Sequence, residues 1–245
     1  LLPLLQCHGR RAYRRISTFL CYYIYKHLVL VAGEFAWAHM SGFGGEIAYP
    51  EWLNTSFAVV FTWLPVLVVL GFDVDVPDRV ALAHPELYHE GHRRVYFNVP
   101  LLVAWILLGF WHGTMSWVVP SLTIGCREHG DPCFWVGSVV SFTLVLVFVT
   151  LRLWLIALSP RSPAVLAVLF LAIACYPCVL AILGYTPLGE WLESRLVGVP
   201  AQVFEDSQVL VVLGLTPLCL LVDALWSGSQ LLFRPTPLQR LRWRS

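Results

Sequence analysis

A basic side chain inside an apolar segment is the first sign of chemistry in this chain. Lys26 lies about a third of the way along the run LCYYIYKHLVLVAGEFAW. A charged side chain at the centre of a bilayer costs about 2.5–3.5 kcal/mol on insertion scales, so such residues usually face a cavity or a partner. A lysine about 10 Å deep can also extend its ammonium group back toward the lipid headgroups. The residues alone therefore leave two hypotheses for Lys26, a binding group in a groove and a snorkelling side chain.

Two further polar residues, His27 and Glu34, share this segment. Glu34 is eight residues from Lys26, which on a helix is about 12 Å along the axis and too far for a direct ion pair. His27 and Glu34 are seven residues apart and nearly in line, so they could border one groove. Alternatively, a neighbouring helix satisfies the carboxylate of Glu34 and its role is structural.

The composition indicates what kind of element carries these residues. The chain has 245 residues, of which 58% are apolar and 13% are charged, whereas soluble domains have about 45–50% and 25%. The apolar residues gather in runs near the length of about 20 residues that crosses a hydrocarbon core of about 30 Å. The sequence thus predicts an all-α polytopic membrane bundle of six transmembrane helices, at about 19–40, 54–72, 99–120, 135–157, 164–184 and 208–227.

The segments outside the runs complete the expected organisation. We expect a cytosolic stalk at 1–18, a membrane domain at 19–233 with a cytosolic loop at 73–98, and a basic cytosolic tail at 234–245. The first residue is Leu1 rather than methionine, so the sequence is expected to be a fragment of a longer protein or an incomplete gene product.

The basic residues predict which side of the membrane each loop faces. Thirteen arginines flank the runs on one side, at positions 10, 11, 14, 15, 79, 93, 94, 152, 161, 234, 240, 242 and 244. The opposite loops hold two arginines and eight acidic residues. Cytosolic loops carry the excess of basic residues, so both termini are predicted to be cytosolic. An even number of spans requires the same.

Two cysteines bracket the outward-facing sequence CREHGDPC. Cys126 and Cys133 could form a disulfide that closes this short loop, since disulfides persist outside the cytosol. Free thiols are the alternative. A metal site with His129 and Asp131 is conceivable, but no further ligands occur at a familiar zinc spacing.

The stretch from Phe61 to Asn98 carries a series of sequence motifs. An apolar segment, FTWLPVLVVLGF, is followed by DVDV, by PELYHEG and by FN. This order and spacing resembles the phospholipid-transporting (P4-type) P-type ATPases, or lipid flippases, in which F/Y-T-x-L-P leads into F-D-x-D-V, then Y-P-E-L-Y-x-x-G-Q and F-N. The residues that match are Phe61, Thr62, Leu64, Pro65, Phe72, Asp73, Asp75, Val76, Pro85, Glu86, Leu87, Tyr88, Gly91, Phe97 and Asn98.

The resemblance extends to the first span. Flippases carry Y-K-N there, which reads Tyr25-Lys26-His27 here, and the preceding H-G-R-x-x-Y-x-R matches from His8 to Arg15. The resemblance implies that Lys26 lies beside the path of the lipid and is needed for transport. Histidine in place of the family's asparagine is a departure, and an imidazole is bulkier and can titrate.

Other departures fall at positions that the resemblance places along the same path. The family's N-G-F-S-G-Q reads SGFGGE, so that Ser41 replaces an asparagine and Glu46 a glutamine. The family's Tyr-Asn pair in the second span reads Phe57-Ala58, which removes a polar group. The predicted substrate-path residues are Lys26, His27, Glu34, Ser41, Phe57 and Ala58. The departures predict an altered lipid preference, or a relaxed or degenerate pump.

The resemblance also implies an activity for the intact protein. Flippases use ATP and Mg²⁺ to move a phospholipid from the outer to the cytosolic leaflet, usually with a two-span glycosylated accessory subunit. The motifs D-K-T-G and D-G-E-T and a phosphate-binding loop do not occur in these 245 residues. We therefore expect no catalytic residue here and no ATP hydrolysis by this segment without the remaining pump domains. No nucleic-acid partner is predicted.

Two other hypotheses belong to different functional classes. A truncated gene product could act as a catalytically dead six-span scaffold or decoy for a partner subunit. An unrelated channel or secondary transporter would show similarity between its halves, and the sequence has none.

Overall fold

The computed structural model describes residues 4–72, 78–125, 133–157, 162–205 and 207–233, and the regular elements within these ranges are all helices. Five of the described helical segments are long and apolar enough to cross a membrane: Leu5–Met40, Glu51–Gly71, Val99–Ile124, Phe134–Ile156 and Pro163–Tyr185. A shorter apolar stretch, Val209–Leu225, occupies the position of the sixth predicted span. The prediction of an all-helical membrane bundle is confirmed.

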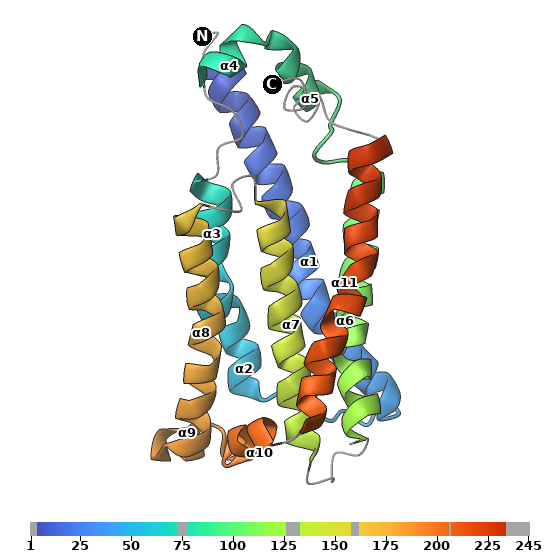
Figure 1. The fold of residues 1–245 in the computed structure, drawn as a ribbon, viewed down its shortest axis with the longest axis vertical. Helices are drawn as coiled ribbons and strands as arrows, with labels where there is room; N and C mark the ends of the chain where they lie inside the picture. Colours follow the sequence, from blue (N-terminus) through green and yellow to red (C-terminus); the bar gives the residue numbers. More distant parts are fainter. Residues whose placement is uncertain (1–3, 73–77, 126–132, 158–161, 206, 234–245) are drawn as a thin grey trace.

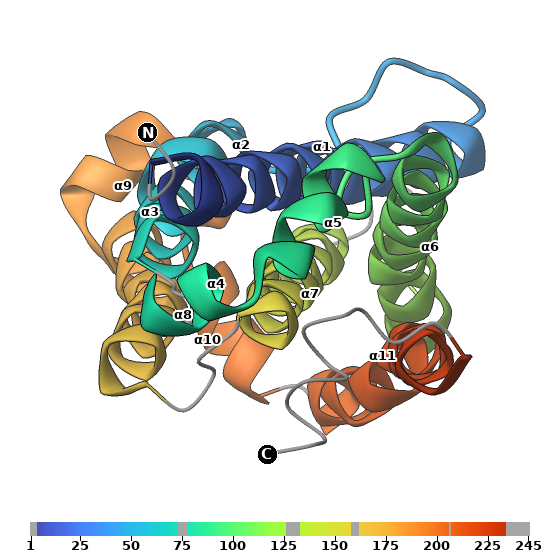
Figure 2. The same ribbon diagram turned by 90° about the horizontal axis from the view of Figure 1, so that it is seen from above.

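The long helices run along a common direction and form one bundle (Figure 1). They are α1 (Arg10–Met40), α6 (Val99–Ile124), α7 (Phe134–Ile156), α8 (Pro163–Tyr185) and α11 (Ser207–Phe233). The second span consists of α2 (Glu51–Ser56), η2 (Phe57–Phe61) and α3 (Trp63–Phe72). In Figure 2, α7 lies in the middle, with α3 and α8 on one side and α6 and α11 on the other.

Short helices cover the two ends of the bundle. One end carries α4 (Asp78–Ala83), η3 (Pro85–Tyr88) and α5 (His89–His92), and the other carries α9 (Pro187–Leu192), η4 (Ser194–Leu196) and α10 (Val199–Glu205) (Figure 1). The described chain begins and ends at the α4–α5 end, as an even number of spans requires. That this end faces the cytosol stays a prediction from the arginine count.

The predicted stalk and the first span form one continuous helix. A π-helical turn, η1 (Leu4–Gly9), runs directly into α1, which is 31 residues and so about 46 Å long. The start of α1 contacts the loop at 78–98, because Arg11 forms an ion pair with Asp78. The guanidinium of Arg14 also lies 4.9 Å from the centre of the Tyr96 ring.

Two glycines allow other parts of the chain to pack closely against α1. A Cβ atom at Gly113 of α6 would overlap the backbone carbonyl of Val29 in α1. A Cβ at Gly33 would overlap the hydroxyl of Tyr49, which lies 3.1 Å from Oγ of Ser141 in α7. Small residues at such positions let membrane helices pack by backbone contact. Burial raises the pKa of Tyr49 to about 12, so this hydroxyl stays neutral at physiological pH.

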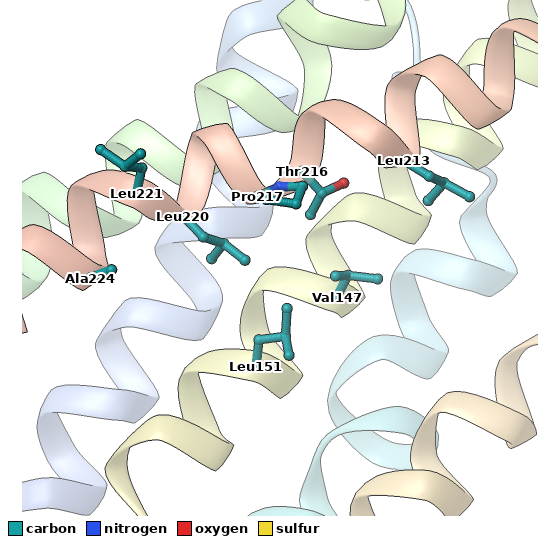
Figure 3. Close-up of a pocket in the computed structure, with 8 residues that line it drawn as sticks. All are labelled: Val147, Leu151, Leu213, Thr216, Pro217, Leu220, Leu221 and Ala224. Carbon is teal, nitrogen blue, oxygen red and sulfur yellow. The ribbon is translucent and has the colours of Figure 1, made fainter.

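The prolines inside the spans have different consequences. Pro177 and Pro217 lie within uninterrupted helices, α8 and α11, as predicted. In α11, Thr216 donates its hydroxyl proton to the carbonyl of Val212 at 3.4 Å. Thr216 and Pro217 border an apolar groove of about 470 Å³ between α7 and α11 (Figure 3). Pro65, by contrast, follows an interruption of the second span, which the sequence predicted as one helix.

A buried ion pair joins α7 to α11. The sequence placed Arg152 at a cytosolic link, but the residue lies inside α7 with 6% of its surface exposed, and it pairs with the fully buried Asp223. Its guanidinium also lies 4.2 Å from the centre of the Trp105 ring in α6. The arginine is tolerated within the bundle because an opposite charge and an aromatic face compensate it, so it does not report on the orientation of a loop.

Candidate functional site

Polar side chains lie along the contact between α1 and the second span. At one point on this contact, Lys26 is 4% exposed and donates a hydrogen bond from Nζ to Oγ1 of Thr62 at 2.8 Å. Further toward the α9–α10 end, Glu34 meets Asn54. We call the contact that includes these two pairs, with His27 and Ala58 between them along the chain, the polar seam.

The break in the second span explains the position of Thr62. Pro65 has no N–H, so the carbonyl of Phe61, four residues earlier, loses its intrahelical donor. The helix before this point is π-helical, and Thr62 lies outside both helical segments. The Thr62 hydroxyl donates to the carbonyl of Phe57 at 2.9 Å and lies 3.4 Å from that of Ala58. One side chain therefore bonds to the backbone of the interrupted segment and accepts a hydrogen bond from the lysine.

Lys26 is held without a counter-ion. In the part of the chain that the structure describes, no carboxylate lies within salt-bridge distance of its ammonium group. The nitrogen instead lies 5.3 Å from the centre of the Tyr23 ring and 5.9 Å from that of Phe57. An ammonium group has three N–H donors, and Thr62 takes one. The remaining two and the uncompensated charge suit an anionic group such as a phosphate.

His27 faces a shallow hollow on the outer side of α1. The hollow has a volume of about 410 Å³ and is lined by Tyr23, Ile24, His27, Leu28 and Val31. The edge of the imidazole packs against Tyr23, with ring centres 4.6 Å apart. Nε2 of His27 is buried and has no hydrogen-bond partner among the described residues. The ring thus lines a hollow that adjoins the seam, while one of its nitrogen atoms is buried.

Glu34 is hydrogen-bonded across the seam. Its Oε1 accepts from Nδ2 of Asn54 in α2 at 2.9 Å, and both side chains are half-buried. Among the described residues, the other carboxylate oxygen has no hydrogen-bond partner. This arrangement is the one in which a neighbouring helix satisfies the carboxylate. It also leaves one oxygen available.

Of the other predicted path residues, two lie beside the seam and one lies far from it. Phe57 is fully buried and Ala58 is half-buried, both in η2 beside the seam. Ser41 lies beyond the end of α1, about 22 Å along the helix axis from Lys26, and its hydroxyl donates to the carbonyl of Ala38. The structure therefore does not bring Ser41 together with Lys26. Cys126 lies outside the described residues, so its disulfide with Cys133 stays a prediction.

Two seam residues were not predicted as part of the site. Thr62 was identified only as part of a motif, although the hydroxyl of a threonine in an apolar helix often bonds to a carbonyl of the preceding turn. Asn54 lies at the first position of the predicted second span, where a polar residue is usually taken as flanking. Its contact with Glu34 depends on how the two helices face each other.

Comparisons with known proteins agree with the motifs of the first two spans. The chain matches, over residues 1–236, the family model described as phospholipid-translocating P-type ATPase C-terminal. It is 34% identical over 128 residues to the mouse (Mus musculus) phospholipid-transporting ATPase FetA, an alignment that covers 52% of this chain and 11% of that protein. It is also 35% identical over 107 residues to phospholipid-transporting ATPase 10 of Arabidopsis thaliana, covering 44% of this chain and 9% of that protein.

A human (Homo sapiens) relative, the probable phospholipid-transporting ATPase IM, is 34% identical over 117 residues, covering 48% of this chain and 10% of that protein. The aligned part of the chain thus spans about a tenth of the length of these curated relatives. The family model, however, matches nearly the whole chain. The chain belongs to the family of phospholipid-translocating P-type ATPases, and it matches their C-terminal region.

Proposed function

We propose that this chain is part of the lipid path of an ATP-driven flippase that moves a phospholipid from the outer to the cytosolic leaflet. The observation that carries the proposal is the environment of Lys26, a buried cation beside a broken helix with no acidic partner among the described residues. A buried charge of this kind is costly to keep, and a phosphate passing along the seam would compensate it.

The lipid would move with its headgroup in the seam and its acyl tails in the bilayer. Lys26 would contribute two N–H donors to the phosphate while Thr62 keeps the ammonium group in place. His27 would line the adjoining hollow beside this path. Exposed apolar side chains of α1, such as Ile24 and Val31, would meet the tails. In this arrangement, only the polar part of the lipid enters the protein.

The energy would come from domains outside this chain. Membership of the family implies ATP and Mg²⁺ for the intact enzyme, and the described residues contain no group of three or more His, Cys, Asp or Glu side chains that could hold a metal ion. Movements of the phosphorylation domain would reach Lys26 through α1. The ion pair between Arg11 and Asp78 would let the loop at 78–98 support the start of that helix.

The loops at the opposite end are the proposed contact of an accessory subunit. They include α9 and α10, which lie across the end of the bundle (Figure 1). Trp191 of α9 is 81% exposed and Leu188 is 55% exposed. Large apolar side chains at the membrane surface suit either a bilayer interface or a partner, and co-purification with and without Trp191→Ala distinguishes the two.

The test of the lipid path is Lys26→Ala in the full-length protein that carries this chain. We expect lipid-stimulated ATP hydrolysis to fall at least tenfold, while membrane insertion and the elution profile in detergent stay unchanged. The matched control is His39→Ala, an exposed polar residue of the same helix, which should keep normal stimulation. Near-normal stimulation of Lys26→Ala by every phospholipid tested would overturn the proposal.

A further inference from the structure

The polar pair of Glu34 and Asn54 lies in the seam, one helical turn nearer to the α9–α10 end than Ala58, where the resemblance expects an asparagine. The family's asparagine in the second span is Ala58 here, and Asn54 lies four residues before it. Residues four apart lie on the same face of a helix, about 6 Å apart along the axis. The amide of Asn54 therefore occupies the same face as Ala58, and it donates to Glu34 at 2.9 Å.

The two charged residues of the seam lie in a defined order. Glu34 lies eight residues after Lys26 in one uninterrupted helix, so it is about 12 Å nearer to the α9–α10 end. Among the described residues, neither residue has a partner of opposite charge. A headgroup that enters from that end meets a carboxylate first and an ammonium group second.

The surface around this end is acidic. Its described residues include five glutamates, Glu46, Glu51, Glu190, Glu193 and Glu205, of which four are exposed, and one arginine, Arg195. Arg195 lies within 3.8 Å of the carboxylate of Glu193. The remaining negative charge raises the local concentration of cationic groups and lowers that of anionic ones.

From these observations we propose that Glu34 and Asn54 form an outer station that binds the cationic group of a zwitterionic phospholipid headgroup. The available carboxylate oxygen of Glu34 faces the ammonium or choline group, and Asn54 holds that carboxylate in place. The phosphate of the same lipid then moves inward to Lys26. A serine headgroup, which adds a carboxylate, is repelled at this station. The inference rests on the proposed function and adds a substrate class to it.

The test measures how the full-length protein ranks lipids. ATP hydrolysis is measured with phosphatidylethanolamine, phosphatidylcholine and phosphatidylserine in mixed micelles, and the wild type should prefer the first two. Glu34→Gln removes the charge but keeps an oxygen that can accept from Asn54, so thermal stability should stay the same. We expect its preference for the zwitterionic lipids over phosphatidylserine to fall about tenfold.

A second variant and a control separate the possible roles of the pair. Asn54→Ala leaves the charge but removes the donor that holds it, so the preference should fall by a smaller factor, about threefold. Glu190→Gln removes an exposed carboxylate at the same end and should leave the ranking nearly unchanged. Should Glu34→Gln lose stability, the lipid ranking of Asn54→Ala decides.

Each outcome bears on a different hypothesis. An unchanged lipid ranking in Glu34→Gln and Asn54→Ala, with loss of stimulation in Lys26→Ala, overturns the outer station and leaves the lipid path intact. The pair would then serve only to hold α1 against α2. A wild type that no phospholipid stimulates overturns the proposed function, and the outer station with it.

Discussion

Replacement of Thr62 by valine tests whether the break in the second span positions the lysine. Valine has nearly the same shape as threonine but has no hydroxyl, so the substitution removes the acceptor for Nζ of Lys26 and the donor to the carbonyl of Phe57. The apolar packing around the site is retained. The matched variant is Thr62→Ser, which keeps the hydroxyl and loses one methyl group.

The magnitude follows from the two hydrogen bonds. A hydrogen bond to a charged group contributes about 1.5–3 kcal/mol, which corresponds to about 10- to 150-fold in an equilibrium constant. If the bond to Thr62 fixes Lys26 for the phosphate, the lipid concentration that gives half-maximal ATP hydrolysis should rise by at least about tenfold in Thr62→Val. The lost hydrogen bond to the carbonyl of Phe57 should also lower the free energy of unfolding by about 0.5–1.5 kcal/mol.

The assay is a lipid titration of ATP hydrolysis with the full-length protein in detergent, together with thermal unfolding of the same samples. Thr62→Ser should retain most of the lipid affinity because its hydroxyl can make both bonds. A Thr62→Val protein that binds lipid as well as the wild type, or more tightly, would refute a positioning role. That result would mean that Lys26 leaves Thr62 before the phosphate arrives.

Three further predictions concern the scaffold around the seam. Gly113→Ala should lower the free energy of unfolding by about 1–3 kcal/mol, because its methyl group would overlap the Val29 carbonyl. Gly137→Ala, whose methyl group meets no atom within 4 Å, should not lower it. Equal melting temperatures of the two variants would contradict the close packing of α1 on α6. Removing either partner of the Arg152–Asp223 pair should lower the free energy of unfolding by about 3–5 kcal/mol. In thermal unfolding, the double variant Arg152→Met/Asp223→Leu should be more stable than either single variant. A double variant whose loss equals the sum of the two single losses would exclude the coupling. Tyr49 has a folded-state pKa of about 12 and an unfolded value near 10. Its contribution to stability is therefore complete below pH 10 and is lost as the pH rises toward 12. If Tyr49→Phe lost as much stability as the wild type over this pH range, the loss would not come from Tyr49.

The membrane helices could be predicted because their lengths and apolar composition are set by the bilayer. Each described helix of the bundle covers the greater part of its predicted run, and the largest difference is at the start of α1, which begins before the predicted span. The charged residues at 10–15 continue the helix because each N–H group can still bond to the carbonyl four residues earlier, whether the side chains are charged or apolar. The end of a helix therefore cannot be read from the end of an apolar run.

The contacts within the bundle could not be read from the runs. The apolar pattern continues unchanged across Thr62, so only Pro65 marks the interruption. Arg152 was placed at a loop because it lies near the end of a run, and its burial depends on Asp223, 71 residues later. The pair of Glu34 and Asn54 likewise depends on the rotation of two helices about their axes. Lys26, by contrast, could be chosen as a candidate from the sequence, because a charge within an apolar run is unusual whichever way the helix faces.

The two sides of the seam differ in mechanical stiffness. α1 continues unbroken from Arg10 to Met40, so a displacement or rotation applied at its Arg10 end would be transmitted along the helix. The second span is interrupted at Thr62, which lies between η2 and α3. When a continuous helix moves along an interrupted one, the relative displacement concentrates at the interruption. Lys26 is hydrogen-bonded to Thr62 at that point, so in the proposed lipid path a movement of α1 would first change the contacts of a headgroup there.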